Sequence, residues 1–189
     1  MNPMDKKSNR RILAILFTGV LMGALDISIV GPAIPSIEEK LLVEPRLLGW
    51  IFSIYVLFNL TGVSLFARLS DIFGRRNIYM VSLGIFALGS LIVSTSKSFD
   101  TLLIGRAVQG FGASGIFPVA SAVVGDIFPP EKRGQVLGLI GAVFGLAFLI
   151  GPIIAGILLN FFEWTVLFLI LIISSAILLK NRRSELRAQ

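Results

Sequence analysis

Long apolar stretches alternate along the chain with short polar connections. Six of these stretches come close to the ~20 residues that an α-helix needs to cross the hydrocarbon of a bilayer. They run over residues 12–34, 48–66, 78–95, 102–124, 136–159 and 165–179. The pattern therefore predicts an all-α membrane protein with six transmembrane helices in a single domain over residues 1–189.

Composition narrows the classes of protein that fit this pattern. Hydrophobic residues make up 55% of the chain and charged residues 15%, whereas a soluble domain carries about 25% charged residues. The chain has no cysteine and no histidine, which excludes disulfides, thiol chemistry and the usual zinc ligands. No phosphate-binding loop or nucleophile–base pair stands out. We expect a protein that is not an enzyme, has no catalytic residue, cofactor or metal, and is surrounded by membrane lipid.

Basic residues gather in every second connection. One set of connections holds most of them, namely Lys6, Lys7, Arg10, Arg11, Arg68, Arg75, Arg76, Lys132, Arg133, Lys180, Arg182, Arg183 and Arg187. The other set holds only Lys40, Arg46 and Lys97. Because lysine and arginine favour cytoplasmic loops, both termini are predicted to be cytoplasmic. This bias explains the net charge of +6, so nucleic acid is not expected as a partner. The N-terminal apolar stretch is interpreted as a retained helix rather than a signal peptide.

The connection after the second stretch has the highest charge density of any short internal connection. Gly74 precedes Arg75 and Arg76, where it lets the backbone turn sharply between helices. Asp71, Arg75 and Asp126 fall at the same predicted membrane face, so they could form an ion-pair cluster. Such clusters hold one arrangement of helices and break in another, although isolated surface pairs contribute little energy.

Asp26 places a carboxylate inside the first apolar stretch, ~22 Å along a helix from Arg11. A charge at that depth is costly unless it faces a cavity or a partner, so a functional role is the default interpretation. Arg106 would lie ~9 Å deep from the opposite face, and its long side chain could close much of the gap to Asp26. Gln109 follows one helical turn later on the same face, with donor and acceptor groups.

Several interpretations of these polar residues stay open. Asp26 could bind a transported proton and release Arg106, or it could be a structural acid locked to one basic partner. Arg106 could instead bind an anionic substrate or extend to the outer headgroups. Tyr55 and Asn59 share a face of the second stretch. We predict that they line a substrate cavity together with Gln109, but they could equally bond to a neighbouring backbone.

The fifth stretch is unusually rich in glycine, which lets helix backbones approach closely in lipid. Gly151, Pro152 and Gly156 mark its far end. Proline lacks a backbone donor and crowds the preceding turn, so a bend or weak point is predicted at Pro152, and another at Pro118 in the fourth stretch. A rigid packing face would show the same residues.

Together these motifs resemble the N-terminal half of a major facilitator superfamily transporter, and more narrowly the drug–proton antiporter branch. Residues 25–30 are similar to the acidic first-helix motif of multidrug exporters, and residues 68–76 to the signature loop between helices two and three. Residues 106–112 resemble the fourth-helix motif, and residues 151–156, followed by Trp164, the fifth-helix antiporter motif. Alanine stands where these motifs usually have glycine at Ala67, Ala147 and Ala155.

The resemblance implies a fold and a set of roles. The fold would be a half-bundle of two inverted three-helix repeats. Asp26 and Arg106 would couple transport to protons, Asp71 would cap a helix of an opposite half, and Arg75 would pair with Asp126. Superfamily transporters enclose their site between two six-helix halves, so this chain would need a second copy of itself or another six-helix half.

The expected function is proton-coupled export of small lipophilic or drug-like molecules through the cell membrane. Transport would proceed by alternating access in a homodimer of half-length chains. One alternative is a half-transporter or membrane binding subunit that does not transport. Another is a transporter of anionic metabolites, with Arg106 as the counter-ion.

Overall fold

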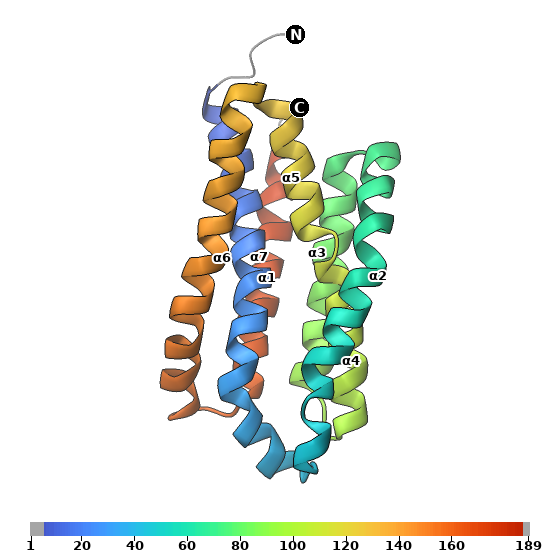
Figure 1. The fold of residues 1–189 in the computed structure, drawn as a ribbon, viewed down its shortest axis with the longest axis vertical. Coiled ribbons are helices and arrows are strands. Elements are labelled where there is room, and N and C mark those ends of the chain that lie inside the picture. The colour runs from blue at the N-terminus through green and yellow to red at the C-terminus, as the bar shows by residue number, and fades with distance from the viewer. Residues whose placement is uncertain (1–5, 187–189) are drawn as a thin grey trace.

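The computed structural model describes residues 6–186, and side chains from residue 12 to residue 180. The basic residues at positions 6–11 and 182–187, on which the predicted orientation partly rests, lie outside the described side chains. Almost every residue between 6 and 186 is helical, and no strand occurs among them. The elements in chain order are α1 (Lys6–Leu41), η1 (Pro45–Leu47), α2 (Trp50–Phe73), α3 (Arg75–Ser94), α4 (Phe99–Ala113), α5 (Ile116–Ile127), α6 (Pro130–Leu159) and α7 (Thr165–Leu186) (Figure 1).

Five segments of the described chain are long and apolar enough to cross a membrane. They are Ile12–Leu41, Pro45–Phe73, Arg75–Ser94, Phe99–Ile127 and Pro130–Leu159. The sixth predicted stretch falls in α7, whose apolar part, Thr165–Lys180, is shorter. A sixth crossing therefore stays a prediction.

Helices extend beyond several of the predicted ends. α1 continues through Pro32 and Pro35 to Leu41, and α2 continues to Phe73. The connection expected at residues 67–76 is therefore helical except at Gly74. The physical reason is that polar side chains mark where a helix leaves the apolar layer, while its backbone hydrogen bonds continue.

The fourth predicted stretch, residues 102–124, is divided into α4 and α5 at Ser114 and Gly115. Pro118 explains the position of the break, because a proline ring crowds the carbonyl four residues earlier, here that of Ser114. By contrast, α6 passes Pro152 without interruption. The weak point predicted at Pro152 therefore does not break the helix.

The helices pack in two groups that flank the middle of the bundle (Figure 1). α1 packs along α6, α7 packs on α3, and α4 packs against both α2 and α3. α1 begins and α7 ends at the same end of the bundle, which is also where α2 turns into α3 (Figure 1). The arrangement leaves α2 and α6 with broad, exposed apolar faces.

Several glycines set the short distances around α4, and Gly110 and Gly89 are two of them. A Cβ added at Gly110 would lie 2.2 Å from the carbonyl oxygen of Tyr55 on α2. One added at Gly89 on α3 would lie 2.3 Å from the backbone nitrogen of Gln109. Backbone atoms cannot yield to such contacts, so the absence of side chains here determines how closely α2 and α3 approach α4.

Candidate functional site

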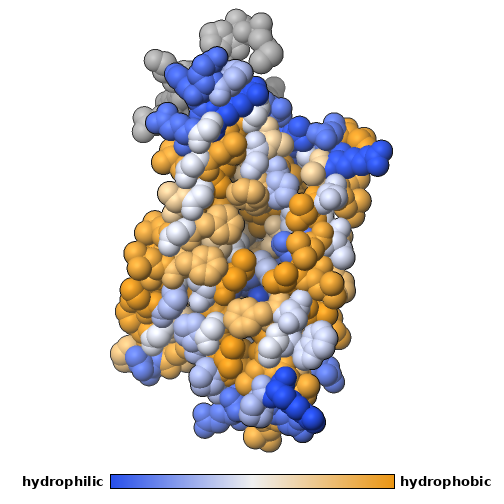
Figure 2. All heavy atoms as spheres, in the orientation of Figure 1, coloured by the Kyte–Doolittle hydropathy of each residue, from blue (hydrophilic) through white to orange (hydrophobic). Residues whose placement is uncertain are grey.

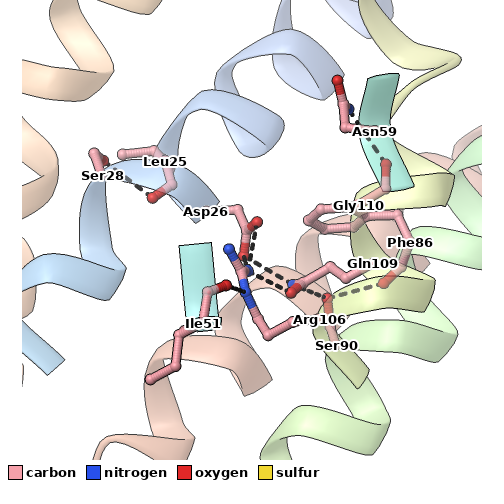
Figure 3. A network of polar contacts seen from close by, with 10 residues as sticks. All are labelled: Leu25, Asp26, Ser28, Ile51, Asn59, Phe86, Ser90, Arg106, Gln109 and Gly110. Carbon is pink, nitrogen blue, oxygen red and sulfur yellow. Dashed lines mark hydrogen bonds and ion pairs between the residues drawn. The ribbon is translucent and has the colours of Figure 1, made fainter. Parts of the chain in front are cut away.

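Asp26 of α1 and Arg106 of α4 form an ion pair inside the bundle, and both side chains are completely buried. Nη1 of Arg106 lies 2.9 Å from Oδ2 and 3.1 Å from Oδ1 of Asp26 (Figure 3). Nε of Arg106 donates to the carbonyl of Ile51 at 3.3 Å. The guanidinium carbon lies 4.2 Å from the centre of the Tyr55 ring. Because Arg106 is fully buried in these contacts, it does not extend to the outer headgroups.

Gln109 connects this pair to α3. Its Oε1 accepts from Nη1 of Arg106 at 2.6 Å, and its Nε2 donates to Oδ1 of Asp26 at 2.8 Å. Nε2 also donates to Oγ of Ser90 at 2.8 Å (Figure 3). Charged groups removed from water need such replacement partners. The three helices α1, α3 and α4 therefore meet in one buried polar network.

One donor of the network is left over. Among the described residues, Nη2 of Arg106 is buried and has no hydrogen-bond partner. An unmade bond of this kind is costly for a buried charged group. Nη2 can therefore donate a hydrogen bond to a bound molecule or a water.

A cavity of about 250 Å³ lies beside the network. Its wall includes Val20 of α1, Tyr55 and Asn59 of α2, Phe117 of α5 and Phe144 of α6, and none of the described residues that line it is charged. Figure 2 shows this face of the molecule hollowed near its middle, with apolar side chains on both sides. The cavity therefore suits an apolar ligand with few polar groups.

The predicted cavity residues occupy different positions. Tyr55 forms both a wall of the cavity and the surface on which the Arg106 guanidinium stacks. Asn59 lines the cavity and also donates to the carbonyl of Gly110 at 3.2 Å, and its contact with a substrate stays a prediction. Gln109 is not among the residues that line this cavity, because it is buried in the network.

Arg75 joins two acidic side chains at the end of the bundle where α2 turns into α3. Its Nε donates to Oδ2 of Asp126 at 3.1 Å, and its Nη1 is paired with Asp71. Nη1 also donates to Oγ of Ser70 at 2.7 Å. The structure thus links α2, α3 and α5 through one arginine, and both carboxylates remain exposed.

Gly74 is the single residue between α2 and α3. Its φ of 88° lies in the left-handed region that side chains with a Cβ rarely adopt. Arg76 follows in the first turn of α3 and is half-buried. The turn therefore needs glycine for its backbone angle rather than for space, since an added Cβ would meet no atom within 4 Å.

The three predicted α6 residues differ in their surroundings. Gly151 is buried, and an added Cβ would lie 2.0 Å from Oγ of Ser28 on α1. Pro152 and Gly156 are exposed, and an added Cβ at Gly156 would meet nothing within 4 Å. Only Gly151 therefore belongs to a close helix contact within the described chain.

Comparison with known proteins gives the family. The sequence profile described as Major Facilitator Superfamily matches residues 16–180. The chain belongs to this superfamily. Its members are transporters and not enzymes, and the chain is a multi-pass protein of the cell membrane.

Several curated superfamily members are similar to the chain in sequence. It is 37% identical over 167 residues to the Uncharacterized MFS-type transporter YfiU of Bacillus subtilis, covering 88% of the chain and 32% of that protein. It is 33% identical to Multidrug resistance protein 3 of the same organism, covering 83% and 30%. It is also 33% identical to the Riboflavin transporter RibZ of Clostridioides difficile, covering 84% and 35%. The chain spans about a third of the length of these relatives.

Solved structures show the same fold at low sequence identity. The xylose transporter XylE from E. coli, in a partially occluded inward-open conformation, matches with a TM-score of 0.80 at 15% identity, over 92% of this chain and 47% of that one. The human organic anion transporter MFSD10 matches with a TM-score of 0.73 at 21% identity, over 90% and 46%. The superfamily fold is therefore present over about half of each solved chain.

The sequence reasoning missed two members of these sites. Ser90 contacts Gln109, and Ser70 contacts Arg75. Serine in a membrane helix usually bonds to its own backbone, so neither residue gives a signal of its own. Ser70 lies between Arg68 and Asp71 in the motif of residues 68–76, and this position alone suggested that it contacts charged side chains.

Proposed function

We propose that this chain forms part of a proton-coupled exporter of small lipophilic molecules that works by alternating access. The observation that carries the proposal is the buried pair of Asp26 and Arg106 beside an apolar cavity. A buried carboxylate is costly to ionise without its partner and can take up a proton instead. Asp26 is therefore the residue we assign to proton binding.

Protonation of Asp26 would change how α1 is held. The ionised carboxylate accepts bonds from Arg106 and Gln109, both on α4. α1 otherwise packs mainly along α6. Neutralising Asp26 weakens its tie to α4 and lets the pair α1 and α6 shift relative to α2 and α4. Two alternative arrangements of this kind are what alternating access requires.

The cavity supports a lipophilic substrate. Aromatic and aliphatic side chains dominate its wall, and two of them, Phe117 and Phe144, pack edge to face with their ring centres 5.8 Å apart. Curated relatives include Multidrug resistance protein 3 and Multidrug transporter protein MdtP of Bacillus subtilis. A substrate that reaches Tyr55 would lie against the ring that supports Arg106, so substrate and proton would compete.

The exposed faces of α2 and α6 support a second six-helix unit. Both helices flank the cavity and carry large exposed apolar side chains, including Phe58 on α2 and Phe148 on α6. The pairing of α1 with α6 and of α4 with α2 is what an inverted three-helix repeat would produce. A second copy of the chain is the simplest unit to close the cavity, and Asp71 would then meet a helix of that copy.

Proton-driven efflux from proteoliposomes tests the proposal. Ethidium efflux driven by an imposed pH gradient should be present in the wild-type protein and fall to the level of protein-free liposomes in Asp26→Asn. The matched control is Asp100→Asn, which removes an exposed carboxylate at the start of α4 and should leave efflux intact. Gradient-driven efflux that survives in Asp26→Asn would contradict the proposal.

Transport of an organic anion is a second candidate, favoured by the unpartnered Nη2 of Arg106. A carboxylate or sulfonate could accept a hydrogen bond there. Inhibition of ethidium efflux by Nile red but not by fluorescein would support lipophilic export. Uptake of fluorescein without ethidium efflux would support the anion function, and no flux of either dye would favour a subunit that does not transport.

A further inference from the structure

Ser90 of α3 is a buried hydroxyl that contacts the network without touching Asp26 or Arg106. Its Oγ lies 2.9 Å from the carbonyl oxygen of Phe86, one turn earlier, and 2.8 Å from Nε2 of Gln109. A serine hydroxyl has one proton, and a carbonyl can only accept. The proton therefore points to Phe86, and Ser90 accepts the hydrogen bond from Gln109.

This bond and the bond from Nη1 of Arg106 favour the same orientation of the Gln109 amide. Its nitrogen faces Ser90 and Asp26, and its oxygen faces Nη1 of Arg106. Both contacts suit an ionised Asp26, which only accepts, and a charged Arg106, which only donates. If the amide turned by 180°, its oxygen would face Asp26. That orientation favours a protonated Asp26, which could donate a hydrogen bond to the oxygen.

Ser90 is the residue of α3 that contributes to this selection. Gly89 lets α3 approach so closely that an added Cβ would lie 2.3 Å from the backbone nitrogen of Gln109. Among the described side chains, the charged or titratable ones that face Asp26 are Arg106 from α4 and Tyr55 from α2. The contribution of α3 is the uncharged Ser90 hydroxyl, acting through Gln109.

We propose that Ser90 is a positioning residue of the proton site: it holds the Gln109 amide in the orientation that stabilises the ionised pair of Asp26 and Arg106. This inference rests on the proposed function, because it assigns Ser90 a part in setting the pH at which Asp26 takes up a proton. Without the Ser90 oxygen, one of the bonds that oppose the turned amide is lost, so the orientation that offers protonated Asp26 an acceptor becomes less costly.

The chain offers a closely matched control. Ser82 lies on the same helix, is completely buried, and donates to the carbonyl of Ile78 at 2.9 Å, as Ser90 does to Phe86. The difference is the bond that Ser90 accepts from Gln109. Ser82→Ala therefore reproduces the loss of a buried hydroxyl and a helix bond without touching the network.

Infrared titration of the purified protein in lipid nanodiscs tests the inference directly. The carboxyl band of protonated Asp26 is identified by its loss in Asp26→Asn, and its half-maximal pH is measured. We expect Ser90→Ala to raise this pH by about one unit, the scale of one hydrogen bond to a charged group. Ser82→Ala should leave it unchanged, and Ser90→Cys, whose sulfur is a weak acceptor, should fall between.

Coinciding titrations of Ser90→Ala and Ser82→Ala would overturn the inference, as would the absence of an Asp26 band in every variant. If Ser90→Ala does not fold, the test uses Ser90→Cys instead. A half-maximal pH of the Asp26 band equal to that of the wild type in Ser90→Cys would then overturn the inference. Efflux separates this result from the proposed function. A raised midpoint in Ser90→Ala together with efflux independent of Asp26 would keep the positioning role and refute proton-coupled export.

Discussion

At the scale of single residues, the central feature is the desolvated ion pair of Asp26 and Arg106. Desolvation costs several kcal/mol per ion unless other groups replace the solvent. Asp26 accepts bonds from Arg106 and Gln109, and Arg106 also bonds to the carbonyl of Ile51 and stacks on Tyr55. Each charge is therefore compensated by the other and by neutral groups, except at Nη2 of Arg106. Removing one member leaves the other buried without its counter-charge.

Arg106→Gln should lower the free energy of unfolding by about 3–5 kcal/mol, because it leaves the Asp26 carboxylate buried without a cation. The double variant with Asp26→Asn should recover part of that loss, since no unpaired charge then remains. Thermal unfolding in detergent measures the stability of the single and the double variant. Additive effects of the two substitutions would show that the residues do not act as a pair.

Some of these residues could be predicted from the sequence, and others could not. Asp26 and Arg106 stand out because a charge in an apolar stretch is rare, and helix rise alone places them at compatible depths. The contacts from Tyr55 and Ser90 depend on how α2 and α3 rotate against α4. That rotation follows from close contacts at Gly110 and Gly89, which sequence spacing does not determine.

At the scale of elements, small residues decide which helices can move apart. α4 is held against α2 and α3 by contacts in which backbone meets backbone, whereas α6 exposes most of its glycines. The polar connection at residues 67–76 was expected to be a loop and is helical except at Gly74. Hydrophobicity marks the boundaries of the membrane layer, and helix ends depend instead on glycine and proline geometry.

Gly110→Ala should be strongly destabilising, because the added Cβ would lie 2.2 Å from the carbonyl oxygen of Tyr55. Overpacking of this kind typically costs about 1–3 kcal/mol. Gly84→Ala on α3 is the control, since its added Cβ meets nothing within 4 Å. Thermal unfolding should separate the two variants clearly. Equal midpoints would mean that α2 and α4 do not pack as closely as described.

At the scale of the whole molecule, the described helices form a bundle with one open, apolar side. The cavity opens on this side, between the exposed faces of α2 and α6. The sequence predicted the family and the half-bundle, because its motifs are specific in combination. A second copy that closes the cavity stays a prediction, since an open apolar face accepts lipid or protein alike.

A second copy on this face predicts a native mass of twice the 20.5 kDa chain in nanodiscs. Gly141→Leu, on the open face of α6 where an added Cβ meets nothing within 4 Å, should weaken the dimer without unfolding the chain. Gly84→Leu provides a control on α3. Native mass spectrometry measures the fraction of dimer in both variants. A wild-type monomer, or a dimer unaffected by Gly141→Leu, would contradict a homodimer built on this face.

The most direct test of proton–substrate competition is proton release on ligand binding. Purified protein in weakly buffered solution is mixed with ethidium, and the change in pH and the amount of bound dye are recorded together. Binding should release protons from the wild type near the half-maximal pH of Asp26. Asp26→Asn should bind the dye without releasing them. Equal release from both proteins, or wild-type binding with no release, would contradict the assignment of Asp26 as the proton site.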